Sequence, residues 1–380
     1  MKTRFLFFVP PMSMMLLLAP APTASAQPPP RSPAVESIEK VLGTWMSGQG
    51  IPGLSIAIIR DGQTILENGY GMADLENFVP AKASTVFRTA SMGKPMTATA
   101  AMHLAEARKL DLDAPVQRYC PAFPARKWPL TTRGLLRHVS GIRHYGGPHD
   151  QEEQFSTKHY ASVVDSLQPF KDDPLKFEPG TEYSYSTYGY DVIGCAIEGA
   201  SGMPYLKAMQ ALIFDPSRMP RTRDDDPSVV IPNRAAGYVR ENGSLRNAPH
   251  VDMSNRLPAG GFLTTAGDLA RFGAAFIDCK LVSCATRDAM LVEYPLKNGD
   301  TVNYGLGWAL EEDLSGRTTG RASHGGSSPG ASGILFIVPR ERLSIAILTN
   351  LESAPQRDNT VAEIADIVLG ASNDKVQSNK

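Results

Sequence analysis

The sequence predicts an α/β (α+β) domain over residues 35–370, in which one antiparallel sheet is built from both ends of the chain. Near the start, GLSIAIIRDGQTILENGYG places two β-branched apolar runs around Asp61-Gly62, which is a hairpin pattern. Near the end, GASGILFIVP and LSIAILTN flank the turn 340–342. These last runs are almost continuously apolar, as in central strands covered on both faces. The residues between are rich in helix and loop patterns, which predicts a mostly helical insertion at about 110–260.

The first 26 residues have the pattern of a secretory signal peptide. Lys2 and Arg4 give a basic start, an apolar stretch follows over 5–18, and Ala24-Ser25-Ala26 is a small-residue cleavage site. We therefore expect cleavage after Ala26 and a periplasmic or secreted protein. The alternative is an uncleaved anchor. No later segment approaches the roughly 18 apolar residues of a membrane span, so we expect no integral membrane association after cleavage.

The flanks of the domain are predicted from composition and helical spacing. Residues 27–34 form a Pro-rich linker, and an amphipathic helix follows over 37–47. A second helix follows Thr265, which can cap it with Asp268 three residues on. A third helical pattern closes the domain before the polar residues 371–380, which are expected to be disordered.

Charge and cysteine content narrow the function classes. The chain has 38 Lys+Arg against 39 Asp+Glu and no basic block, so nothing favours a nucleic acid or an anionic membrane as partner. The four cysteines, Cys120, Cys195, Cys279 and Cys284, permit disulfides in an exported chain. Cys279 and Cys284 are the one close pair, but all three connectivities remain open. There is no CxxC, and no cofactor or metal is expected.

A Ser-x-x-Lys tetrapeptide is the first candidate for catalysis, although it occurs three times in the chain. Ser37–Lys40 lies among charges on a predicted helix face, and Ser372–Lys375 lies in the polar tail. Ser91–Lys94 instead opens a helix rich in alanine and methionine, which predicts burial. Pro95 fits only the first turn of a helix, so Ser91 lies at or just before its N-terminus.

The spacing places Lys94 on the same face as Ser91. Burial disfavours the charged ammonium, and the resulting neutral amine could take the proton of the serine hydroxyl. The alternative from the residues alone is that Ser91 is a helix cap and Lys94 extends to the surface.

Further motifs resemble the serine β-lactamase and penicillin-binding protein family, with the closest likeness to its class C branch and to mitochondrial β-lactamase-like members. The matching segments are TTRGLLRHVSGIRHY (131–145), FEPGTEYSYSTYGYDVIG (177–194), LPAGGFLTTAGDLARFG (257–273) and SHGGSSPGASG (323–333). They occur in the order of the family, and the likeness runs from about residue 35 to 370. It implies the β-lactamase/DD-peptidase fold.

The resemblance also implies roles for residues. Ser91 would be the nucleophile, Lys94 the group that activates it, and Tyr185 a partner in proton transfer. We expect the pKa of Tyr185 to be lowered by a cationic lysine beside it, so that it could act as a base. Thr187 stands where the family usually has asparagine, and a hydroxyl replaces only part of the hydrogen bonding of that amide.

The third family element is matched by the segment from His324 to Ser327, which contains Gly326. The backbone N–H groups of Ser327 and Ser91 would form an oxyanion hole. His324 replaces the usual lysine and would bind a substrate carboxylate less strongly, since histidine is mostly neutral at pH 7. The alternative is a hydrogen-bonded structural histidine.

Two other motifs, a nucleophile elbow and a histidine cluster, are weaker candidates for a functional site. Gly326-x-Ser328-x-Gly330 matches a nucleophile elbow, but strand-like residues follow it and no histidine lies downstream. His138, His144, His149 and Asp150 fit no familiar zinc spacing, and His138 is expected to be structural.

The predicted function is therefore an exported serine hydrolase that acts on a small-molecule or peptide substrate, an amide or ester such as a β-lactam, through a Ser91 acyl-enzyme. The alternatives are a penicillin-binding protein with slow turnover and a non-catalytic scaffold of the same fold.

Overall fold

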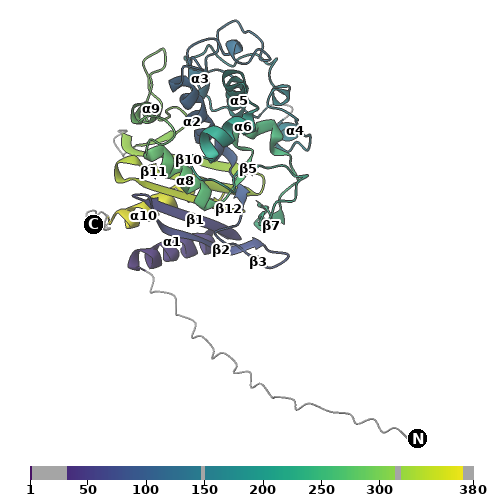
Figure 1. The fold of residues 1–380 in the computed structure, drawn as a ribbon, viewed down its shortest axis with the longest axis vertical. Coiled ribbons are helices and arrows are strands. Elements are labelled where there is room, and N and C mark those ends of the chain that lie inside the picture. The colour runs from purple at the N-terminus through teal and green to yellow at the C-terminus, as the bar shows by residue number, and fades with distance from the viewer. Residues whose placement is uncertain (2–31, 147–149, 313–317, 371–380) are drawn as a thin grey trace.

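The computed structural model describes Met1 and residues 32–146, 150–312 and 318–370. Within these residues the main sheet has seven strands in the order β3-β2-β1-β12-β11-β10-β9, and each neighbouring pair is antiparallel (Figure 1). The strands are β1 (Gly53–Arg60), β2 (Gln63–Asp74), β3 (Val79–Pro80), β9 (Ala309–Glu312), β10 (Thr318–Ser328), β11 (Ala331–Val338) and β12 (Leu343–Thr349). Strand β1 pairs with β12, so the first and last strand groups share one sheet, as predicted.

The two predicted turns are also present. Asp61 (φ 51°) and Gly62 (φ 73°) are both left-handed, the conformation that a two-residue hairpin turn requires. Between β11 and β12 a single 3₁₀ turn ends at Arg342 (φ 47°). These local conformations set the register of the strands that carry the core.

The continuous apolar runs are explained by a sheet that is covered on both faces. Alternate residues of β1 enter different cores: Ala57 and Ile59 pack in the core on the side of α8 (Ala266–Ile277), and Ile56 and Ile58 pack in the other. The second core is closed by two helices, α1 (Pro33–Gln49) and α10 (Arg357–Leu369), which contact each other and lie at the lower left of the domain in Figure 1.

Helix α1 begins two residues earlier than the predicted domain boundary. Ser32 caps it by accepting a hydrogen bond from Val35 N, and Pro33 occupies the first turn, where its missing N–H has no cost. Helix α8 begins as predicted, with Thr265 Oγ1 accepting from Asp268 N at 3.1 Å.

The predicted signal peptide, apart from Met1, most of the linker and the polar tail 371–380 lie outside the described residues. In the part of the chain that the structure describes, no helix is both long enough and apolar enough to cross a bilayer.

The inserted region is less helical than predicted. Its neighbourhood contains the small sheet β4-β8-β5 and the hairpin β6-β7, whose strands of two to four residues are too short for a readable periodicity. These strands are β4 (Phe87–Arg88), β5 (Arg223–Asp224), β6 (Tyr238–Glu241), β7 (Ser244–Asn247) and β8 (Phe262–Thr264).

The remaining helices are α2 (Gly93–Glu106), α3 (Thr132–Leu136), α4 (Asp150–Gln154), α5 (Thr187–Ser201), α6 (Tyr205–Met209), α7 (Leu257–Gly260) and α9 (Cys284–Met290). Single turns of 3₁₀ helix are η1 (Ala90–Met92), η2 (Val116–Arg118), η3 (Asp165–Leu167), η5 (Met253–Arg256) and η6 (Pro339–Glu341), and η4 (Gln210–Phe214) is a π turn.

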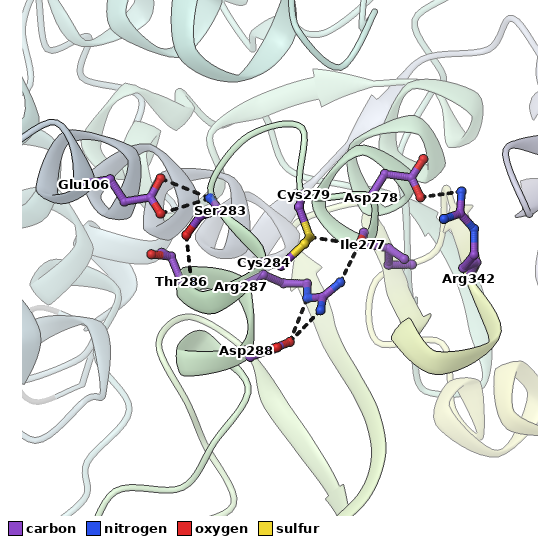
Figure 2. Close-up of a disulfide and its surroundings, with 10 residues drawn as sticks. All are labelled: Glu106, Ile277, Asp278, Cys279, Ser283, Cys284, Thr286, Arg287, Asp288 and Arg342. Atoms are coloured by element: carbon purple, nitrogen blue, oxygen red, sulfur yellow. Dashed lines mark hydrogen bonds and ion pairs between the residues drawn. A yellow bond between two sulfur atoms is a disulfide. The ribbon is translucent and has the colours of Figure 1, made fainter.

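Two disulfides resolve the cysteine connectivity. Cys120–Cys195 links the segment after η2 to α5, and Cys279–Cys284 closes the short loop between α8 and α9. Figure 2 shows that this loop is also held from two sides. Glu106 at the end of α2 accepts from Ser283 N at 3.0 Å, and Asp278 pairs with Arg342 at 2.9 Å.

Candidate active site

The nucleophile candidate Ser91 lies in η1, directly before α2. The preceding residue, Ala90, has φ 45°, a left-handed conformation that is uncommon outside glycine. Gly260 (φ 142°) packs against it so closely that a Cβ on Gly260 would lie 1.6 Å from Ala90 O. The backbone at Ser91 is therefore positioned by a contact that only glycine permits.

Lys94 is fully buried on the first turn of α2. Its Nζ lies 3.1 Å from Ser91 Oγ, 3.4 Å from Thr187 Oγ1 and 3.3 Å from Ala259 O. The side chain therefore does not extend to the surface, and its amine is within hydrogen-bond distance of the serine.

The surroundings of Lys94 make it a weak base. Burial lowers the pKa of Lys94 to about 7, opposed by Asp191 and reinforced by Arg256. A substantial fraction of neutral amine is therefore present near neutral pH, and a neutral amine can accept the proton of Ser91.

Tyr185 lies just before α5, with Lys94 Nζ 4.8 Å from the centre of its ring. Its hydroxyl is hydrogen-bonded to Ser91, but dense surroundings desolvate it and raise its pKa well above the usual value. The predicted lowering of this pKa is wrong, because desolvation outweighs a lysine that is itself only partly charged. Tyr185 is therefore a neutral proton donor at pH 7.

Two histidines hold the segment that carries Tyr185 and Thr187. His138 Nδ1 accepts from Ser186 N at 3.1 Å, and His144 Nδ1 accepts from Thr187 N at 3.2 Å. The His138 ring also packs on Tyr185, with the ring centres 4.3 Å apart. His138 therefore contacts the segment that carries Tyr185, as expected of a structural residue. No group of three or more possible metal ligands occurs among the described residues.

Strand β10 lies against η1 at Gly326. A Cβ added there would be 2.9 Å from Ser91 N and 2.8 Å from Thr89 O, so the strand approaches the nucleophile through its backbone. Ser327 follows, exposed, and lines the same cleft as Ser91, with its Oγ 3.0 Å from Ser353 Oγ.

His324 is buried behind Tyr185, with the ring centres 6.3 Å apart, and its expected role in substrate binding stays a prediction. Its Nε2 lies 3.0 Å from Tyr304 OH and its Nδ1 lies 2.8 Å from Gly325 O. Burial, followed by the charge of Lys94, lowers the pKa of His324 to about 3. Both ring nitrogens have protein partners, as the alternative of a structural histidine would require.

The cleft at Ser91 has a volume of about 260 Å³ and two facing walls. One wall comes from residues near 144–154 and 253–260, and the other comes from residues near 327–329 and 352–353. The sequence did not identify Arg256 or Glu352 in the walls, nor the buried Asp191 near Lys94. For Asp191, the one available indication was a carboxylate inside an otherwise apolar helical run.

Known proteins resemble this chain in sequence and in fold. The family profile described as Beta-lactamase matches residues 38–369. The mitochondrial serine β-lactamase-like protein LACTB of Mus musculus is 30% identical over 86% of this chain and 77% of its own length. Penicillin-binding protein 4* of Bacillus subtilis is 28% identical over 83% of this chain and 72% of its own.

Solved structures share the fold. EstCE1, a hydrolase with promiscuous acyltransferase activity, superposes with a TM-score of 0.76 at 23% identity, covering 88% of this chain and 98% of its own. The D-amino acid amidase of Ochrobactrum anthropi SV3 superposes with a TM-score of 0.75 at 22% identity, covering 90% of this chain and all of its own. The predicted fold is confirmed, and the extent of the profile match, together with the sequence relatives, shows that this chain belongs to the β-lactamase family of serine hydrolases and penicillin-binding proteins.

Proposed function

We propose that the protein hydrolyses an amide or ester through an acyl-enzyme on Ser91. The observation that carries this proposal is the environment of Lys94, a buried amine with a pKa of about 7 whose Nζ lies 3.1 Å from Ser91 Oγ. A lysine with only a structural role would destabilise the fold at this buried position, because burial of a cation without a paired carboxylate is unfavourable.

Acylation follows from these groups. Lys94 accepts the hydroxyl proton as Ser91 Oγ attacks the carbonyl carbon, and the backbone N–H groups of Ser91 and Ser327 stabilise the oxyanion. Tyr185 donates its proton to the departing nitrogen or oxygen, and the proton held by Lys94 then replaces it. Thr187 accepts a hydrogen bond from Lys94 and keeps the amine directed at the serine.

Deacylation repeats the chemistry with water in place of the serine hydroxyl. Lys94, neutral again after acylation, accepts a proton from that water, and Tyr185 donates a proton to Ser91 Oγ as the acyl bond breaks. The rate of this step separates a hydrolase from a penicillin-binding protein with slow turnover.

The test is to incubate the purified protein with a fluorophosphonate, a chromogenic cephalosporin and a short-chain nitrophenyl ester, and to measure adduct mass and turnover. We expect an adduct on the peptide that contains Ser91, absent in Ser91→Ala, and at least a ~100-fold lower rate in Lys94→Ala.

Each alternative has its own outcome in this test. A loss below tenfold in Lys94→Ala would exclude Lys94 as the base. A persistent penicilloyl adduct without turnover identifies a slow penicillin-binding protein. No adduct, with every activity unchanged in Ser91→Ala, identifies a scaffold.

We also propose that the protein is exported. The basic and apolar pattern of residues 1–26 supports this, as do two disulfides, which persist in oxidising compartments. Mass spectrometry of the protein from a periplasmic or culture fraction should find Gln27 at the N-terminus. An intact N-terminus in a reduced, cytoplasmic protein would contradict it.

A further inference from the structure

Arg256 is a buried cation on the wall of the cleft. Its side chain lines the cleft beside Ser91 and Lys94, and only 6% of its surface is exposed. Within the described residues it forms no ion pair with a carboxylate. Asp191 interacts with its charge, but burial raises the pKa of Asp191 well above its usual value, which favours the neutral acid. A buried guanidinium without a counter-ion is unfavourable unless a ligand supplies one.

The guanidinium plane is held in place by the protein. Nε donates to Asn255 Oδ1 at 2.8 Å, and Nη2 donates to Glu153 O at 2.9 Å and Gln154 O at 2.6 Å. The group also stacks over Tyr145, 4.8 Å from the ring centre. Nη1 donates no hydrogen bond to any described residue, so it is the nitrogen left for a ligand. A fixed donor loses little entropy when an anion binds.

The charges of the two walls differ. Arg256 is the one formally charged side chain of its wall among the described residues, whereas the opposite wall carries Glu352. A negative group on the substrate is therefore attracted to the first wall and repelled by the second. One guanidinium with one free nitrogen suits a monoanionic carboxylate better than a phosphate dianion.

From this arrangement we propose that Arg256 binds a carboxylate of the substrate, so that the protein prefers acyl donors that carry a negative charge near the scissile carbonyl. This inference rests on the proposed acyl-enzyme function and names the substrate class of the same site.

The experiment compares two nitrophenyl esters, 4-nitrophenyl hydrogen glutarate and its neutral methyl ester. The corresponding succinate and adipate pairs vary the distance between the carboxylate and the scissile carbonyl. We expect the wild-type protein to favour the charged member of at least one pair by about tenfold or more in kcat/KM. Arg256→Gln should lower that ratio to near one. The ratio is the readout because loss of the Arg256 charge also acts on the pKa of Lys94, which changes the rates on both esters of a pair alike. Arg256→Lys should keep part of the ratio.

A matched control is available in Arg137, which also stacks on a tyrosine, Tyr294, at 4.8 Å and donates to Tyr294 O at 2.6 Å, but does not line the cleft. Arg137→Gln should keep the wild-type ratio. The inference is overturned if no pair shows a preference for the charge, or if Arg256→Gln retains it. Thermal melting of each variant identifies a loss of folding.

Failure of the proposed function is distinguishable from failure of this inference. If neither ester of any pair turns over and no adduct forms on Ser91, the acyl-enzyme proposal fails alone, and calorimetry of 4-nitrophenyl hydrogen glutarate with Ser91→Ala still tests Arg256. Binding that weakens about tenfold or more when Arg256→Gln is added supports the carboxylate site, and equal binding overturns it.

Discussion

At the scale of single residues, burial of the Lys94 amine lowers the stability of the folded chain. The side chain is fully buried, and its partners are a carbonyl, Ala259 O, and two hydroxyls, on Ser91 and Thr187. Below pH 7 the amine must carry its charge in this environment, and the desolvation is unfavourable. The property that makes Lys94 a base is therefore one that destabilises the folded chain.

Replacing Lys94 with methionine should raise stability while removing activity. The pKa of Lys94 is about 7 in the folded protein against 10.5 for an ordinary lysine, so between these values the unfolded chain binds more protons and wild-type stability rises with pH. Lys94→Met lacks this dependence. We expect it to be more stable by a few kcal/mol at pH 6 and by much less at pH 10, measured by urea denaturation. A variant less stable than wild type at both pH values would contradict this account.

At the scale of elements, the contact between η1 and α7 positions the nucleophile. Ala90 keeps its left-handed backbone beside Gly260, the last residue of the short helix α7, where an added Cβ would lie 1.6 Å from Ala90 O. Strand β10 closes the other side through Gly326. Two elements that are distant from η1 in sequence thus hold its backbone, and Thr89 Oγ1 adds a hydrogen bond to Gly260 O at 3.0 Å.

Gly260→Ala should displace this turn. A methyl group has no room against Ala90 O, and the shift of Ser91 should lower kcat/KM on a neutral ester by about 100-fold or more. Gly202→Ala is the matched control, since Gly202 also has a positive φ (71°) but has no atom within 4 Å of the added Cβ. It should lose about 1 kcal/mol of stability and keep its activity. Equal activity of both variants would exclude the contact as the positioning device.

At the scale of the whole molecule, the fold is closed by links between distant parts of the chain. The sheet joins β1 to β12, almost 300 residues apart, and Cys120–Cys195 spans 75 residues within the inserted region. The second disulfide, Cys279–Cys284, spans 5. Loop closure restricts the unfolded chain more strongly when the loop is longer.

The two disulfides should therefore contribute unequally to stability. Chain entropy gives about 4 kcal/mol for the Cys120–Cys195 loop and about 2 kcal/mol for Cys279–Cys284. Paired Cys→Ala variants of each bridge, compared by denaturation at pH 7, should show the larger loss for the first. The first bridge also anchors α5, which begins at Thr187, so its loss should lower activity as well. A larger loss from the short loop would contradict the entropic argument.

Much of the fold could be predicted because its determinants are local. The Asp61-Gly62 turn, the continuous apolar strands and the Thr265 cap each depend on neighbours within a few residues. Short strands such as β5 and β8 could not be predicted, because two or three residues carry no periodicity and pair only once the chain is folded.

The order of residues was enough to predict that Ser91 and Lys94 lie one helical turn apart at the start of a buried helix, because Pro95 and the alanine-rich pattern act within that helix. The electrostatics of the site depend on the folded chain: packing lowers the pKa of Lys94, raises the pKa of Tyr185 and buries Arg256 in the cleft wall. The physical reason is that spacing is a property of one segment, whereas desolvation sums the contributions of every segment packed around a group.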